Sequence, residues 1–77
     1  MTTSSRLSEI ELSIIRGLAR GLQSKEVARE LDRSRGTIEF YIRMLFVKLE
    51  ARSRAQVVAR AYELGVLQQE ARDFAAV

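Results

Sequence analysis

The chain has 77 residues with a net charge of +3; 47% of the residues are hydrophobic, 30% are charged, and proline, cysteine and histidine are all absent. One domain with a small core is therefore expected. The lack of cysteine and histidine excludes a disulfide framework and thiolate chemistry, and it removes the commonest metal ligand and general acid–base. An enzyme is the least favoured class, and we expect neither a cofactor nor a metal.

The basic residues are concentrated in the middle of the chain. Between Ser24 and Arg54, eight lysines and arginines stand against five acidic residues. Such a balance is typical of nucleic-acid binders, although small basic domains without a DNA partner are also common. No apolar run approaches the length of a membrane span and no signal pattern precedes the first helix, so a cytoplasmic protein without a membrane partner is expected.

Residues 1–6 are small and polar apart from one arginine, and they predict a flexible N-terminus. The first helix follows Ser8, because Ser8 and Glu11 have the spacing of a capping box. Gly21 suits the left-handed residue after its end. Gly17 lies inside this helix at a cost of about 1 kcal/mol relative to alanine, which a close helix crossing would explain. The apolar positions repeat at helical spacing, at Ile10, Ile14, Ile15, Leu18 and Leu22.

A second, short helix is expected over residues 25–31, with Ser24 as its cap. A tight connection then leads to Ser34, which caps a third helix over about 35–50. Two helices joined by so short a turn are typical of a helix-turn-helix unit in an all-α fold.

The third helix has two different faces. One is an apolar stripe that consists of Ile38, Ile42, Leu45 and Leu49. The other face is unusual for a solvated surface, because it combines a bare glycine, an aromatic ring, a carboxylate and a guanidinium, at Gly36, Glu39, Phe40, Arg43 and Val47. We interpret it as a recognition helix for the DNA major groove; the alternative is an ordinary amphipathic helix with a mixed outer face.

Three residues of this face are candidates for base contacts. Arg43 suits guanine O6 and N7, Phe40 suits a thymine methyl, and Glu39 is the third candidate. The candidates for phosphate contacts lie at helix N-termini and beside the turn. They are Lys25, Ser34, Arg35, Thr37 and Lys48, and for Lys48 a solvated side chain is nearly as well favoured.

Ser53 and Gln56 predict another capping box and a fourth helix over about 54–64, ended by Gly65. Small residues and one tyrosine form a strip beside its apolar side. This strip is either plain surface or, as we favour, a dimerisation contact made by Ala55, Val58, Ala59 and Tyr62. The tail, residues 68–77, is either a helical extension or disordered.

These segments together resemble the LuxR-type (GerE-like) helix-turn-helix family. The resemblance covers residues 7–67 and rests on Leu7 to Glu11, Ala19 to Ala28, Ser34 to Ile38, Lys48-Leu49, and Arg54 through Gly65-Val66-Leu67. Region 4 of bacterial sigma factors shares the first three helices, but the fourth helix favours the LuxR type. The resemblance implies a four-helix transcriptional regulator that binds double-stranded DNA with its third helix and forms a homodimer through its fourth. The resemblance leaves open whether another transcription regulator or RNA polymerase is a further partner.

The chain departs from the family pattern at three positions. Ser24 replaces an asparagine, Tyr41 replaces a histidine, and Glu39 replaces a lysine at a position that faces DNA in the family. Three interpretations of Glu39 compete. It accepts a hydrogen bond from cytosine N4, or it pairs with Arg43 four residues on and orients that guanidinium, or the helix has lost DNA binding.

The last interpretation gives the main alternative function, a protein-interaction module of the same fold that heterodimerises with or masks another regulator. Two further expectations follow from the resemblance. Glu11 and Arg54, both family positions, are expected to pair and join the first and fourth helices. Because only six residues precede Leu7 and the chain starts with Met1, we expect a stand-alone regulator rather than an excised fragment.

Overall fold

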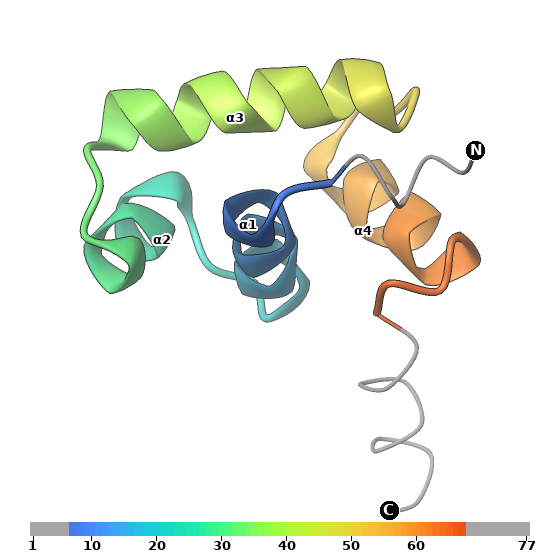
Figure 1. Cartoon of the computed structure of the whole chain (residues 1–77), viewed down its shortest axis with the longest axis horizontal. Helices are drawn as coiled ribbons and strands as arrows, with labels where there is room; N and C mark the ends of the chain where they lie inside the picture. Colours follow the sequence, from blue (N-terminus) through green and yellow to red (C-terminus); the bar gives the residue numbers. More distant parts are fainter. Residues whose placement is uncertain (1–6, 68–77) are drawn as a thin grey trace, which may run out of the picture.

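The computed structural model describes residues 7–67, and within this range it contains four helices and no strand. The helices are α1 (Glu9–Ala19), α2 (Ser24–Leu31), α3 (Arg35–Lys48) and α4 (Arg54–Glu63). The expected all-α, four-helix fold is therefore confirmed. Figure 1 shows that α3 runs along one side of the molecule, with α2 below its first turns, α1 below its middle and α4 below its last turn.

Serine side chains begin three of the helices, as the sequence predicts. The Ser8 Oγ accepts from the Glu11 N–H at 3.2 Å, and the Glu11 carboxylate accepts from the Ser8 N–H at 2.8 Å, which completes the capping box. The Ser34 Oγ accepts from the Thr37 N–H at 3.1 Å. Ser53 caps α4 in the same manner. Each cap satisfies a backbone donor that the first turn of a helix leaves free.

Two details of the expected caps are wrong. The N-cap of α2 is Gln23, whose N–H donates to the Glu26 carboxylate at 2.7 Å, whereas Ser24 is already helical and buried. At α4, the Gln56 side chain accepts from the Arg52 N–H at 2.6 Å rather than from Ser53, so the reciprocal bond of a capping box is displaced by one residue. Ser24 is buried, and its hydroxyl accepts a hydrogen bond from Arg54 of α4.

The predicted apolar stripe of α3 forms the centre of the core. Ile38, Ile42, Leu45 and Leu49 are all at most 4% exposed. They pack with buried residues of the other helices and of the segment after α4, among them Ile14, Ile15, Val27, Val57 and Leu67. Because α3 buries one side completely, its opposite side is presented to solvent along its whole length.

Glycines shape the fold at two kinds of position. A Cβ on Gly17 would lie 2.9 Å from the Val27 Cγ2, so the bare backbone permits the close crossing of α1 and α2. Gly21 and Gly65 have φ of 86° and 85°, the left-handed conformation expected after α1 and α4. The third helix is two residues shorter than expected, because Leu49 is its C-cap and Glu50 has a φ of 53°.

None of the helices in residues 7–67 combines the length and the apolar character that a membrane crossing requires. The predicted N-terminal segment, residues 1–6, and the tail, residues 68–77, lie outside the described residues.

Candidate nucleic-acid interface

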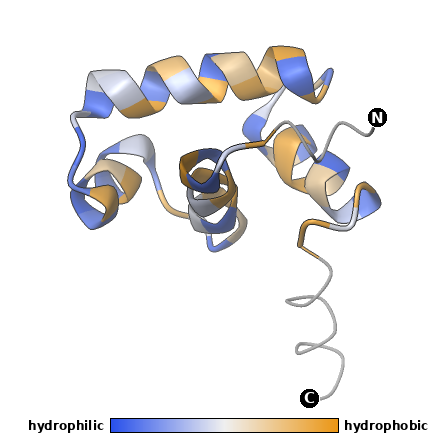
Figure 2. Ribbon diagram, in the orientation of Figure 1, coloured by the Kyte–Doolittle hydropathy of each residue, from blue (hydrophilic) through white to orange (hydrophobic). Residues whose placement is uncertain are grey.

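The outer face of α3 carries large side chains that the rest of the described chain does not cover. Phe40 is 52% exposed and Val47 is 72% exposed, and Gly36 and Arg43 are exposed as well. Met44, for which the sequence predicts no role, is 37% exposed and lies beside them by its helical position. Figure 2 colours each residue by hydropathy and shows apolar residues, those of the buried stripe included, alternating with polar ones along α3.

Glu39 is the exception on this face, because its carboxylate is bound by one arginine of α4 and one of α3 itself. Its Oε2 lies 3.3 Å from the Arg54 Nη2 and 3.9 Å from the Arg35 Nε. The same Arg54 Nη2 donates to the Ser24 Oγ at 2.7 Å. The three side chains of Ser24, Glu39 and Arg54 therefore join the N-terminal parts of α2, α3 and α4.

The surroundings of Glu39 stabilise its ionised form. The Ser24 hydroxyl and the cationic groups of Arg54 and Arg35 lower the pKa of Glu39 below its ordinary value of 4.5, against the opposing effect of burial. The carboxylate is thus charged at neutral pH, and its charge is compensated by two guanidinium groups. An anion that approaches α3 meets a compensated carboxylate rather than an isolated negative charge.

The expected Glu11–Arg54 ion pair is wrong, and so is the one of the three interpretations of Glu39 that pairs it with Arg43. Glu39 and Arg54 pair with each other instead. The Glu11 Oε2 accepts from the Lys48 Nζ at 2.8 Å, so this pair joins α1 to α3 rather than to α4. The reason is that the side chain of Arg54, the first residue of α4, reaches Glu39 of α3, a juxtaposition that spacing along one helix does not reveal.

Lys48 consequently has a structural contact within the chain, its ion pair with Glu11. Glu11 is only 3% exposed, and within residues 7–67 its carboxylate receives bonds from Lys48 and Ser8. Burial alone would raise the pKa of Glu11, but the Lys48 ammonium and the Ser8 donors lower the pKa below 4.5 overall. The predicted phosphate contact of Lys48 is not tested by this arrangement, but its ammonium already has an anionic partner.

The remaining phosphate candidates lie at the other end of α3. Lys25 and Arg35 line an open polar hollow of about 390 Å³ between the N-termini of α2, α3 and α4, together with Gln23, Ser24, Glu39 and Arg54. Ser34 caps α3 nearby, and its hydroxyl donates to the Oγ1 of Thr37 in the first turn at 2.9 Å. The structure therefore brings four of the five candidates to the first turns of α2 and α3.

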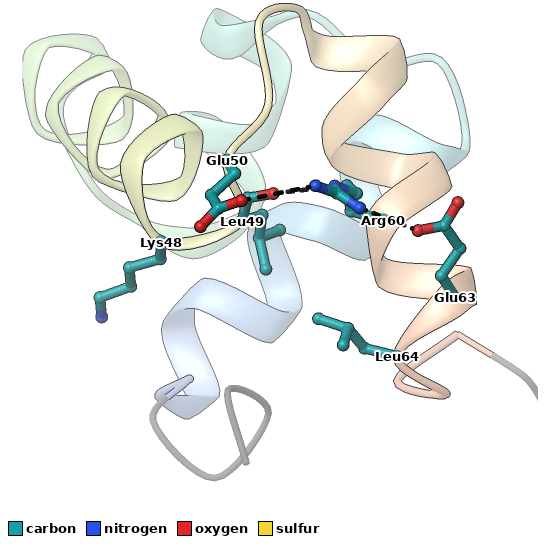
Figure 3. A pocket seen from close by; sticks show the side chains of 6 residues that line it. All are labelled: Lys48, Leu49, Glu50, Arg60, Glu63 and Leu64. Atoms are coloured by element: carbon teal, nitrogen blue, oxygen red, sulfur yellow. Dashed lines mark hydrogen bonds and ion pairs between the residues drawn. The ribbon is translucent and has the colours of Figure 1, made fainter.

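Arg60 of α4 holds the C-terminal end of α3, a role that the sequence does not predict. Its Nε donates to the Leu49 carbonyl at 3.0 Å, and its guanidinium lies 3.7 Å from Glu50 and 3.2 Å from Glu63. Figure 3 shows Arg60 reaching from α4 toward Leu49 and Glu50, whereas Lys48 points away. The contact satisfies a carbonyl at the end of α3 and sets α4 against it.

The predicted dimerisation strip of α4 faces outward for the most part. Ala55 and Ala59 are exposed, Tyr62 is 38% exposed, and Val58 is half-buried against the core. Within the described residues, no group of three or more acidic side chains is arranged to hold a metal ion.

Comparison with known proteins supports the same domain type. Residues 5–61 match the family described as bacterial regulatory proteins, luxR family. The chain is 36% identical over 59 residues to the transcriptional regulatory protein DesR of Bacillus subtilis. The aligned segment covers 77% of this chain and 30% of DesR. The chain is 39% identical over 61 residues to the transcriptional regulatory protein FixJ of Bradyrhizobium diazoefficiens, which covers 79% of this chain and 30% of FixJ. With the nitrate/nitrite response regulator protein NarP of Escherichia coli it shares 44% identity over 50 residues, 65% of this chain and 23% of NarP. The chain thus spans less than a third of each of these relatives.

Proposed function

This chain belongs to the luxR family of bacterial regulatory proteins, and we propose that it binds double-stranded DNA sequence-specifically with α3 in the major groove. It carries the helix-turn-helix domain of these DNA-binding transcription regulators. In this proposal, Phe40 and Arg43 contact base edges. The phosphate backbone is contacted by Lys25, Arg35, the N-cap Ser34 and Thr37.

The exposed Arg43 is the observation on which this function rests. Its guanidinium has no ion pair within residues 7–67, while Glu39, four residues before it, is bound to Arg54 and Arg35. An arginine that its own fold leaves available can form two parallel hydrogen bonds to guanine O6 and N7. We assign Glu39 a positioning role, since its carboxylate already contacts Arg54 and Arg35.

We also propose that α4 forms a homodimer contact through Ala55, Val58, Ala59 and Tyr62. Three of these four side chains are exposed, and two are alanines that permit close approach of a second helix. A two-fold dimer would present two copies of α3 to successive major-groove segments, so a two-half-site operator is expected.

One observation favours a second candidate, a protein-interaction module that binds another regulator without binding DNA. Apolar side chains as exposed as Phe40 and Val47 are more typical of protein interfaces than of a surface that only solvent covers. In that case α3 would enter an apolar groove of the partner.

Fluorescence anisotropy with random-sequence duplex DNA at two salt concentrations separates the candidates. We expect the wild type to bind, to weaken steeply with salt because counterions are released, and to lose about tenfold in affinity on Arg43→Ala. Arg16→Ala, which removes an exposed arginine from α1, serves as the matched control and should change little. If the wild type fails to bind DNA whereas Glu39→Lys binds it, the DNA-binding proposal is wrong and the protein partner is favoured.

A further inference from the structure

We infer that α3 recognises the 5-methyl groups of thymine through an apolar strip that consists of Phe40, Met44 and Val47. The inference rests on the proposed DNA-binding function and adds to it the base that the helix prefers. It assigns base contacts to Met44 and Val47, two residues outside the set that the sequence predicts.

The three residues form a continuous strip because they are spaced four and three residues apart on one helix. Phe40, Met44 and Val47 are 52%, 37% and 72% exposed, respectively. The buried apolar stripe of α3 lies on the opposite side of the helix. The Phe40 ring is held edge-on against Tyr41, with the ring centroids 5.9 Å apart. The strip therefore offers an apolar surface whose first side chain is already oriented.

The charges around the strip favour a polyanion over a protein as its occupant. Arg43 lies on the same face between Phe40 and Val47, and Arg35 is exposed two turns nearer the start of α3. The acidic residue of α3, Glu39, is bound by two arginines. An apolar strip accompanied by Arg43 and Arg35 matches a major groove, whose phosphates lie at the rims and whose floor carries the methyl groups.

Among the base edges in the major groove, only thymine presents an apolar group, its C5-methyl. Burial of a methyl against Phe40, Met44 or Val47 removes apolar surface from water on both sides. Arg43 would add a guanine to a half-site that is otherwise rich in thymine. Because the Glu39 carboxylate is held by Arg54 and Arg35, we assign it no base contact.

Two synthetic duplexes that differ in nothing but this methyl test the inference. The probes are alternating poly(dA-dT) and poly(dA-dU), compared by anisotropy competition at one salt concentration. We expect the wild type to prefer poly(dA-dT) by about fourfold for each methyl group that is buried. Alternating poly(dG-dC) that carries 5-methylcytosine should likewise bind more tightly than the unmethylated polymer.

Substitutions that keep shape but remove apolar character assign the preference to the strip. Met44 and Val47 are exposed, so the variants Val47→Thr and Met44→Gln should fold normally, which circular dichroism checks. Each variant should reduce the ratio of the affinity for poly(dA-dT) to that for poly(dA-dU). Lys25→Met, which removes a charge but no apolar contact, should weaken binding to both polymers equally.

Equal, salt-sensitive affinity for both polymers would overturn the inference and leave the DNA-binding function in place. Failure of the wild type to bind any of the four polymers would overturn both, and it would favour a protein as the occupant of the strip. An unchanged ratio in Val47→Thr and Met44→Gln together would show that the methyl groups are recognised elsewhere.

Discussion

Gly36 is a residue that the fold itself does not require. It lies in the first turn of α3 with ordinary helical backbone, and a Cβ built on it would meet only the Ser34 Oγ, at 4.0 Å. Gly17 is different, because a Cβ there would lie 2.9 Å from Val27. A bare position on the outer face of α3 instead leaves room for a close neighbour from outside the chain.

Gly36→Ala is therefore expected to have opposite effects on stability and on DNA binding. Alanine is the better helix former, so the free energy of unfolding should stay unchanged or rise by up to about 1 kcal/mol. DNA affinity should fall by about tenfold, because the methyl group would hold α3 away from the groove. Thermal unfolding and anisotropy measure the two effects on the same sample.

Gly17→Ala is the control, since the clash with Val27 should lower the melting temperature. If Gly36→Ala binds DNA as tightly as the wild type, the glycine has no role in the contact.

At the scale of elements, the Glu11–Lys48 pair fastens α1 to the end of α3. The Glu11 carboxylate is buried and its distance to the Lys48 Nζ is 2.8 Å. Lys48→Met would keep the aliphatic stem but leave the carboxylate without its cation. Loss of one partner of a buried pair is costly, and we expect a decrease of about 3 kcal/mol in the free energy of unfolding.

Urea unfolding followed by circular dichroism gives this value. Lys25→Met makes the same substitution at an exposed lysine and should change stability by less than about 0.5 kcal/mol. Equal stability of the two variants would mean that the pair contributes nothing. The double variant Glu11→Gln/Lys48→Met should recover part of the loss, because no buried charge is left unpaired.

The same elements show how far the sequence leads. Caps and stripes are local, so Ser8, Ser34 and Ser53, and the buried face of α3, are predictable from spacing alone. Ion pairs between helices are not local. Arg54 pairs with Glu39 and Arg60 with the end of α3 because of how α4 crosses the other helices. Met44 was missed for another reason, since helical spacing places it on the exposed face but its residue type is common in cores.

At the scale of the whole molecule, the proposed function requires two surfaces, one on α3 for DNA and one on α4 for a second copy. The contact on α4 is small, because the helix has ten residues and Val58 is already half-buried within its own chain. Interfaces of limited area associate weakly. The free protein should therefore be mostly monomeric at low concentration and dimerise with a dissociation constant on the order of micromolar.

A duplex with two half-sites should strengthen this weak association, since the second copy then binds from an adjacent site rather than from solution. Ala59→Glu would place a charge in the contact on each copy and should abolish dimerisation in sedimentation velocity and cooperative binding to the two-half-site duplex. Ser13→Glu adds the same charge on α1 and should preserve both. Binding to a single half-site should survive in both variants, because α3 is unchanged. A nanomolar dimer, a strict monomer at high concentration, or an Ala59→Glu variant that still dimerises would contradict the assignment of the contact to α4.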